Sequence, residues 1–455
     1  MMMVSVRFLG AARTVTGSKF HVSAGDMDLM VDCGMFQGLK SLREENWKPL
    51  PVAVPKLKHI LLTHGHLDHI GYLPRMLRQG FKGSILGTAP SLAIAEIILR
   101  DSAEIHEEEA EKANKEGYSK HHPALPFFTQ EEAEAVVKLF RTVPLDEWQE
   151  LGKEISIKWS YNGHIIGATH ITIRIGGKHF VFSGDLGRMD DLLLRDPEKP
   201  RWADYLLLES TYGDRMHPEE DIENLLISLI NRTIEERGTL LIPSFAVERL
   251  QLLMLILWKL YDKNRIPGIP IFVDSPMGVD VLQVFREFPS WYKIPEADFR
   301  AMFRHMTLVS SYRDTWRTID DPRPKIVVAG SGMITGGRIL TYLTKTLDKS
   351  NTTVLLVGYQ AEGTRGRKLL EGAKSLRIFG KDYRVEADVV HLESLSAHAD
   401  QPELLDWLSD IRNIPERVFL IHGEEPAMEV LKTKIEDRYG WSVSIPSQDE
   451  TVTLI

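Results

Sequence analysis

Thr63-His64-Gly65-His66-Leu67-Asp68-His69 is the densest group of candidate metal ligands in this chain. It follows the apolar run Ile60-Leu61-Leu62, which is typical of a buried strand. In α/β folds, side chains that follow a strand lie at the sheet edge where ligands bind. Imidazole and carboxylate groups together favour zinc and its neighbours in the first transition row. A solvated loop is the alternative, but three histidines and an aspartate within six residues favour a metal site.

Composition sets the broad class of the protein. The chain has 455 residues, a length that allows two to four domains. Its residues are 43% hydrophobic and 26% charged, which is typical of a soluble globular protein. No run approaches the ~20 apolar residues of a membrane span, and the first residues do not resemble a signal peptide. The single cysteine, Cys33, excludes an internal disulfide and a thiolate-rich zinc site. We therefore expect a cytoplasmic protein that does not enter a membrane.

The net charge of −9 argues against a protein that coats nucleic acid indiscriminately. It leaves room for a local basic cleft.

Further candidate ligands also stand where predicted strands end. His164 and Asp185 each have glycines on both sides, and His422 follows the apolar run 418–421. Asp32 follows a strand in Val31-Asp32-Cys33-Gly34, where a turn-forming role is the alternative. His164 and Asp185 are each ambiguous when taken alone.

The number of candidate ligands favours two metal ions. Seven side chains are candidates: His64, His66, Asp68, His69, His164, Asp185 and His422. A single zinc uses only three or four protein ligands, whereas two metals that share a carboxylate would use all seven. Centres with two metals ~3.5–4 Å apart typically hydrolyse phosphate esters, amides or lactones.

The second half of the chain predicts a parallel sheet, because buried strands alternate with helices there. Four of these strands lead into helix-opening loops at 243–249, 274–278, 330–338 and 358–367. Such loops on one edge of a sheet form phosphate sites, so we expect a polyanion surface. The loop at 330–338 lacks the Gly-Lys-Ser/Thr ending of a nucleoside-triphosphate loop, so that kind of site is disfavoured.

Taken together, these motifs resemble a known superfamily. The pattern His64-x-His66-x-Asp68-His69, with Asp32, His164 and Asp185, resembles the metallo-β-lactamase superfamily. Glu209, His398 and His422 resemble the three further motifs of its β-CASP branch of nucleases. The resemblance extends from about Val4 to His422. Within this branch, the chain resembles the bacterial β-CASP ribonucleases and the endonuclease subunit of the eukaryotic pre-mRNA cleavage and polyadenylation specificity factor.

The resemblance implies a fold and a domain order. We expect an αββα sandwich formed by residues 1–209 and 388–455. Residues 210–387 would form an inserted α/β domain, with a parallel sheet and flanking helices.

The resemblance also implies a role for each site residue. Two zinc ions, or manganese ions in their place, would be bound. One would be held by His64, His66 and His164, and the other by Asp68, His69 and His422. Asp185 would bridge them. Besides Asp68, the catalytic group would include Asp32, which orients the histidine loop, His398 as general acid and Glu209, which holds the His398 ring.

The implied activity is hydrolysis of RNA phosphodiester bonds in RNA processing or decay. A hydroxide between the metals would attack phosphorus, and His398 would protonate the leaving oxygen. The enzyme would be an endonuclease, a 5′-to-3′ exonuclease or both. It would bind single-stranded RNA through loops that contain Ser331, Thr335, Arg365 and Arg367. A homodimer is compatible with this interpretation.

Histidine at the third β-CASP motif, His422, favours RNA over DNA. The alternatives are a DNA nuclease, a small-molecule hydrolase of the same superfamily and an inactive RNA-binding scaffold.

Overall fold

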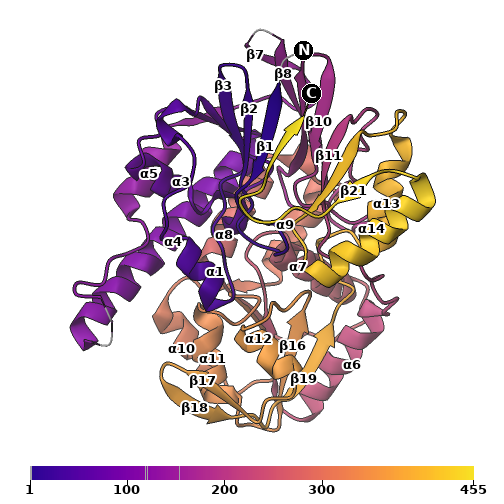
Figure 1. Ribbon diagram of the computed structural model, residues 1–455. Helices are drawn as coiled ribbons and strands as arrows, with labels where there is room; N and C mark the ends of the chain where they lie inside the picture. Colours follow the sequence, from indigo (N-terminus) through magenta and orange to yellow (C-terminus); the bar gives the residue numbers. More distant parts are fainter. Residues whose placement is uncertain (1–2, 118, 120, 153, 455) are drawn as a thin grey trace. The chain divides into compact units, whose positions relative to one another are not determined.

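The computed structural model describes residues 3–117, 119, 121–152 and 154–454, which fold as two compact units (Figure 1). Unit 1 comprises residues up to 190 together with 196–216 and 398–455. Unit 2 comprises residues 191–195 and 217–397. The domain boundaries expected at residues 209 and 387 stay a prediction, because the two units are defined by compactness and not by insertion of one domain into another.

Unit 1 contains two seven-stranded sheets. The first has the order β22-β1-β2-β3-β4-β5-β6. Its strands are β1 (Val4–Phe8), β2 (Phe20–Ala24), β3 (Met27–Val31), β4 (His59–Leu61), β5 (Ser84–Gly87), β6 (Phe140–Thr142) and β22 (Thr451–Leu454). The second has the order β21-β20-β11-β10-β9-β8-β7. Its strands are β7 (Gln149–Gly152), β8 (Ile155–Tyr161), β9 (Thr169–Ile175), β10 (Lys178–Phe182), β11 (Tyr205–Glu209), β20 (Arg417–Ile421) and β21 (Val443–Ser444).

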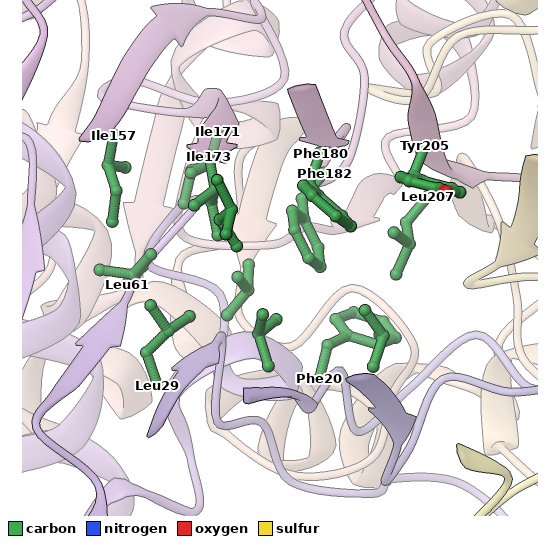
Figure 2. Close-up of a cluster of buried hydrophobic side chains, with 14 of the residues drawn as sticks. Phe20, Leu29, Leu61, Ile157, Ile171, Ile173, Phe180, Phe182, Tyr205 and Leu207 are labelled. Atoms are coloured by element: carbon green, nitrogen blue, oxygen red, sulfur yellow. The ribbon is translucent and has the colours of Figure 1, made fainter. Parts of the chain in front are cut away.

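The hydrophobic core of unit 1 lies between the two sheets. Figure 2 shows Phe20, Leu29 and Leu61 of the first sheet opposite Ile173 and Phe182 of the second. Successive strand residues point to opposite faces, so alternate apolar positions fill this layer. Each fully buried side chain of this size contributes roughly 1.5–3 kcal/mol. The layer therefore holds rigid the strand ends from which the candidate ligands project.

Helices flank the sheets and complete the predicted αββα sandwich, which is confirmed. They are α1 (Lys40–Glu45), α2 (Leu67–Ile70), α3 (Leu73–Arg78), α4 (Ala89–Glu116), α5 (Gln130–Val137), α13 (Gln401–Trp407) and α14 (Glu425–Tyr439). Leu404 of α13 and Met428 of α14 pack against Leu206 and Leu208 of β11, which covers the other face of the second sheet. The Thr88 hydroxyl accepts a hydrogen bond from the Ser91 N–H and so caps the start of α4.

Three details of unit 1 differ from the sequence-based expectation. The sequence predicts one helix over 70–79, but α2 ends at Ile70 with Gly71 as its C-cap, and α3 begins at Leu73 with Pro74 in its first turn. The sequence also predicts a helix over 129–140, but α5 ends at Val137 and Phe140 already belongs to β6. Strand β22, which pairs with β1 and so joins the two ends of the chain, was not predicted.

Unit 2 is built on the predicted parallel sheet, which is confirmed. Its order is β14-β13-β15-β12-β16-β19, and every pair is parallel. The strands are β12 (Thr239–Pro243), β13 (Ile271–Asp274), β14 (Thr307–Leu308), β15 (Lys325–Ala329), β16 (Thr352–Val357) and β19 (Asp388–Leu392). A hairpin of β17 (Ser375–Ile378) and β18 (Lys381–Arg384) stands apart from this sheet.

The helices of unit 2 connect these strands. They are α6 (Ile222–Glu235), α7 (Arg249–Asp262), α8 (Pro276–Glu287), α9 (Glu296–Arg304), α10 (Tyr312–Asp320), α11 (Arg338–Thr346) and α12 (Arg365–Leu370). The four helix-opening loops predicted from the sequence follow β12, β13, β15 and β16, and therefore share one edge of the sheet. Within the described ranges, no helix is long and apolar enough to cross a membrane.

We expect Ile173→Ala to destabilise unit 1 by about 2–5 kcal/mol, because this fully buried side chain fills the layer between the sheets. The shift of the denaturant midpoint measures the effect. Ile414→Ala is the matched control, since Ile414 is 76% exposed, and its effect should stay within about 0.5 kcal/mol. Equal midpoints for the two variants would contradict the proposed position of the core.

Candidate metal centre

The histidine loop joins β4 to the short helix α2, and neighbouring backbone holds it in place. His66 precedes the first helical residue, so Asp68 and His69 lie on the single turn that follows. The Asp68 and His69 carbonyls accept hydrogen bonds from the N–H groups of Ser18 (2.8 Å) and Cys33 (2.7 Å). Gly34 lies so close that a Cβ there would be 1.5 Å from the Asp68 carbonyl oxygen, so only glycine fits.

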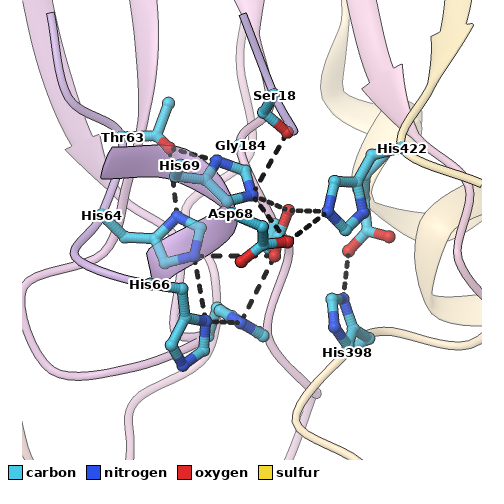
Figure 3. Close-up of polar contacts among 12 residues, drawn as sticks. Ser18, Thr63, His64, His66, Asp68, His69, Gly184, His398 and His422 are labelled. Carbon is cyan, nitrogen blue, oxygen red and sulfur yellow. Dashed lines mark hydrogen bonds and ion pairs between the residues drawn. The ribbon is translucent and has the colours of Figure 1, made fainter. Parts of the chain in front are cut away.

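One group of four donor atoms comes from His64, His66, His164 and Asp185 (Figure 3). His66 Nδ1 lies 3.1 Å from His64 Nε2 and 3.2 Å from His164 Nε2. Asp185 Oδ2 lies 3.6 Å from both His64 Nε2 and His164 Nε2. His64 and His66 share the loop after β4, whereas His164 follows β8 and Asp185 follows β10, and the packed sheets bring these three strand ends together.

A second group comes from Asp68, His69, His422 and the same Asp185. His422 Nε2 lies 3.2 Å from Asp68 Oδ2 and 3.5 Å from Asp185 Oδ1, and His69 Nε2 lies 3.2 Å from Asp185 Oδ1. Asp185 therefore turns Oδ2 toward the first group and Oδ1 toward the second. All seven ligands predicted from the sequence lie in these two groups.

The donor atoms fit a divalent metal. Ligands around a tetrahedral zinc with bonds of 2.0–2.2 Å are about 3.3–3.6 Å apart, close to the distances within both groups. Burial lowers the pKa of His64 well below its usual value and that of His66 to about 4, so both rings are neutral, as metal ligands must be. Asp185 Oδ1 is buried and has no hydrogen-bond partner among the described residues. A cation would satisfy it.

Asp32 and Thr63 orient the ligand rings. Asp32 Oδ2 accepts hydrogen bonds from His69 Nδ1 and the Thr63 hydroxyl, both at 2.8 Å, and its Oδ1 accepts one from the Thr63 N–H, also at 2.8 Å. Because the Thr63 proton goes to Asp32, its oxygen can accept from His64 Nδ1 at 3.1 Å. The rings of His64 and His69 then present Nε2 to the donor groups. This is the orienting role that the sequence predicted for Asp32.

Thr63 and Thr211 were missed in the sequence. The Thr211 hydroxyl donates to the His422 carbonyl at 3.2 Å and lies 3.1 Å from His422 Nδ1, the same arrangement for another ligand. A threonine has no metal-ligand signature, so only its position near the motifs could have suggested this role. His422 itself has a positive φ of 50°, which non-glycine residues rarely adopt and which strained functional sites often contain.

His398 lies beside the donor groups and contacts Glu209. Its Nδ1 is 3.2 Å from Glu209 Oε1, and its ring centroid is 4.5 Å from that of His164 (Figure 3). Glu209 is fully buried and also accepts hydrogen bonds from the N–H groups of Leu186 and Thr211. Burial alone would lower the pKa of His398, but the carboxylates of Glu209 and, further away, of Asp185 outweigh it and raise that pKa. The imidazolium is therefore available as a proton donor.

Three of the four predicted substrate-binding residues form one loop cluster within unit 2. The hydroxyls of Ser331 and Thr335 are 3.0 Å apart, and the Arg365 guanidinium donates to the carbonyls of Thr335 and Ile334. Arg367 instead pairs with Glu371, the C-cap residue of α12, at 2.7 Å. Arg365 therefore holds the loop, and contacts of all four residues with RNA stay a prediction.

Comparison with known families matches three adjoining regions. Residues 22–230 match the metallo-beta-lactamase superfamily, residues 250–369 the Beta-Casp domain, and residues 382–446 the Zn-dependent metallo-hydrolase RNA specificity domain.

Individual proteins are similar along nearly the whole chain. Ribonuclease TTHA0252 from Thermus thermophilus is 35% identical over 93% of this chain and 94% of its own length. Transcription termination factor FttA from Methanocaldococcus jannaschii is 29% identical over 93% of this chain and 67% of its own. A crystal structure of a protein of unknown function from Enterococcus faecalis has a TM-score of 0.55 at 15% identity, covering 99% of this chain and all of that one. This last likeness concerns the fold alone.

We expect Asp185→Asn to lose most bound metal, because Asp185 is the residue that both donor groups share. Metal content per chain, measured by emission spectrometry after dialysis, tests this. Asp406→Asn is the matched control, since its carboxylate pairs with Lys199 at the surface and should leave metal content unchanged. Full metal content in Asp185→Asn would contradict the shared-ligand geometry.

Asp32→Ala should behave differently, because Asp32 supports the ligand rings without joining either donor group. We expect metal affinity to fall about 10–100-fold while the number of ions bound at saturation stays the same. Titration against a competing chelator measures both quantities. A reduced number of ions at saturation would mean that Asp32 is itself a ligand.

Proposed function

Since the chain belongs to the metallo-β-lactamase superfamily, in its β-CASP branch, we propose that it is a metal-dependent ribonuclease that hydrolyses RNA phosphodiester bonds. The observation that carries the proposal is the pair of donor groups that share Asp185, with His398 beside them. A relative that is 35% identical along nearly its whole length is named a ribonuclease. The match of residues 382–446 to an RNA specificity domain supports the same substrate.

The proposal includes two zinc ions, with manganese as the alternative. Neutral histidine nitrogens and carboxylates suit both metals, and each oxygen of Asp185 faces one donor group. When bound there, the metals would polarise the phosphoryl group and activate water for attack on it. The Asp185 carboxylate, together with Asp68, offsets part of their positive charge in this buried site.

His398 is the proposed general acid. Glu209 accepts a hydrogen bond from His398 Nδ1, and the N–H groups of Leu186 and Thr211 fix the orientation of the Glu209 carboxylate. His398 Nε2 is the nitrogen that we propose carries a proton to the leaving oxygen. The Glu209 carboxylate stabilises the imidazolium and keeps the proton available near neutral pH. Glu209 acts through His398 and is a positioning residue.

Further observations bear on the substrate and on the compartment. His422 at the third β-CASP motif favours RNA over DNA, and the presence of all seven ligands argues against an inactive scaffold. A single buried cysteine supports action in a reducing cytoplasm. Cleavage as an endonuclease, a 5′-to-3′ exonuclease or both fits the centre, and a homodimer stays a prediction.

We expect single-stranded RNA to be cleaved in the presence of zinc or manganese and to stay intact with chelator. RNA labelled at either end, carrying a 5′-phosphate or a 5′-hydroxyl, separates the modes of cleavage. Mononucleotides from the 5′ end indicate an exonuclease, and discrete internal fragments indicate an endonuclease. DNA of the same sequence is the matched control. Absence of any metal-dependent RNA cleavage would overturn the proposal, and preferential DNA cleavage would make the protein a DNA nuclease.

We expect His398→Ala to lower kcat about 10²–10⁴-fold while metal content stays at the wild-type level, because His398 belongs to neither donor group. Single-turnover cleavage with excess enzyme measures the loss of rate. Metal analysis of the same preparation measures the metal content. His179→Ala is the control, since His179 pairs with Asp204 away from the centre. Loss of metal in His398→Ala would show that it is a ligand and not the acid.

A further inference from the structure

Two exposed aromatic side chains lie on one face of helix α10 in unit 2. Tyr312 is 58% exposed and Trp316 is 42% exposed. They are four residues apart and are therefore neighbours on the helix surface. Thr315 and Thr318 of the same helix are buried. The helix is thus anchored by small polar side chains and presents its two large rings to solvent.

Two cations from the adjacent helix α11 lie over these rings. The Arg338 guanidinium carbon is 3.9 Å from the centroid of Tyr312, and Lys345 Nζ is 5.3 Å from the centroid of Trp316. Arg338 and Lys345 are seven residues apart, two turns on the same face of α11. The helices lie side by side in Figure 1. We call Tyr312, Trp316, Arg338 and Lys345 the aromatic–basic row.

A buried carboxylate fixes one end of this row. Asp274, at the end of β13, accepts hydrogen bonds from the hydroxyls of Thr315 (2.6 Å) and Tyr342 (2.8 Å). Arg338 donates to Thr315 Oγ1 at 2.6 Å and lies 3.3 Å from Asp274 Oδ1. α10, α11 and β13 are therefore tied together at one point, and the rings need little reordering before they bind a ligand.

The row contains two cations, Arg338 and Lys345, in a chain whose net charge is −9, and the exposed acid Asp320 ends helix α10 beyond it. Lys345 forms no ion pair with any described residue, and neither does the exposed Arg313 on α10. The nearby acid Asp314 is already paired with Arg317 at 2.9 Å. Positive charge on this face is thus available to a phosphate backbone.

We propose that the aromatic–basic row binds single-stranded RNA, with bases stacked on Tyr312 and Trp316 and phosphates on Lys345 and Arg313. Alternating rings and cations form the kind of surface that binds single strands, because every base has a face that stacks and every nucleotide a phosphate. The binding is expected to tolerate many sequences. This inference rests on RNA being the substrate, and it adds a binding surface that belongs to unit 2 alone.

Binding of a labelled oligouridylate to the full-length, chelator-treated protein tests the inference, because the chelator prevents cleavage. We expect Trp316→Ala to weaken binding about 5-fold or more, and Trp316→Phe, which keeps a stacking surface, to retain most affinity. Trp202→Ala is the matched control: Trp202 is 49% exposed but belongs to unit 1, and its loss should leave affinity unchanged. Fluorescence anisotropy gives the dissociation constants, and thermal unfolding verifies that each variant is folded.

A charge test supplies an independent measurement. Lys345→Gln should reduce the slope of log affinity against log salt by about 0.7, the value expected when one phosphate of a single strand is no longer neutralised by a cation. An unchanged slope would remove Lys345 from the proposed binding surface. This readout does not depend on whether the tryptophan variant folds.

The outcomes separate the two proposals. If Trp316→Ala and Trp202→Ala bind RNA with equal affinity while the wild-type protein binds and cleaves it, the aromatic–basic row does not bind RNA. The proposed function would then be unaffected. Wild-type protein that neither binds nor cleaves RNA would overturn the proposed function itself. If Trp316→Ala only converts a dimer to a monomer in sedimentation, the face is an interface between copies of the chain and the RNA proposal is wrong.

Discussion

The metal centre depends on one buried carboxylate, Asp185. A carboxylate removed from water costs several kcal/mol unless cations or hydrogen bonds compensate it. Here the donors that surround it are histidine nitrogens, and one of its oxygens has no hydrogen-bond partner among the described residues. Burial opposes ionisation of Asp185, but His422 and His69 outweigh it and hold the pKa of this carboxyl well below its usual value, so it is ionised. The fold therefore keeps a negative charge at the position that both donor groups share.

That position is precise because the ligands project from strand ends and not from free loops. β4, β10 and β20 stop just before His64, Asp185 and His422, and the packed layer between the sheets fixes where those ends lie. Side chains carried on such rigid elements lose little conformational entropy when a metal binds. Hydrogen bonds with three neighbours then determine which ring nitrogen faces the donor groups. Asp32 does this for His69, Thr63 for His64 and Thr211 for His422. Sheet packing sets the distances, and the hydrogen bonds set the tautomers.

The ligands were predictable from the sequence because metal chemistry restricts residue type and spacing. The ligands of the histidine loop are so close in sequence that they stay close in space whatever the local backbone conformation. Glycines indicated the turns at His164 and Asp185. Thr63 and Thr211 were not predictable, because a hydroxyl that sets a tautomer has no distinctive neighbours in sequence. Strand β22 was missed for a related reason: its partner β1 is at the other end of the chain, and pairing over that separation leaves no local signal. The helix break at Gly71 and Pro74 was also missed, although glycine and proline are the residues that most often interrupt a helix.

Arg365 and Lys345 of unit 2 differ in how many internal partners they have, although both are cations that could bind a nucleic acid. Arg365 was expected to bind RNA, yet its guanidinium donates to the carbonyls of Ile334, Thr335 and Arg377. To reach a phosphate without leaving these acceptors unpaired, which would cost free energy, Arg365 must use Nη2, because Nε and Nη1 make the backbone bonds. Lys345 has no such obligation, because its ammonium group lies over an aromatic face and forms no ion pair with a described residue. Cations with few internal partners are therefore better candidates for binding a polyanion than cations in glycine-rich loops.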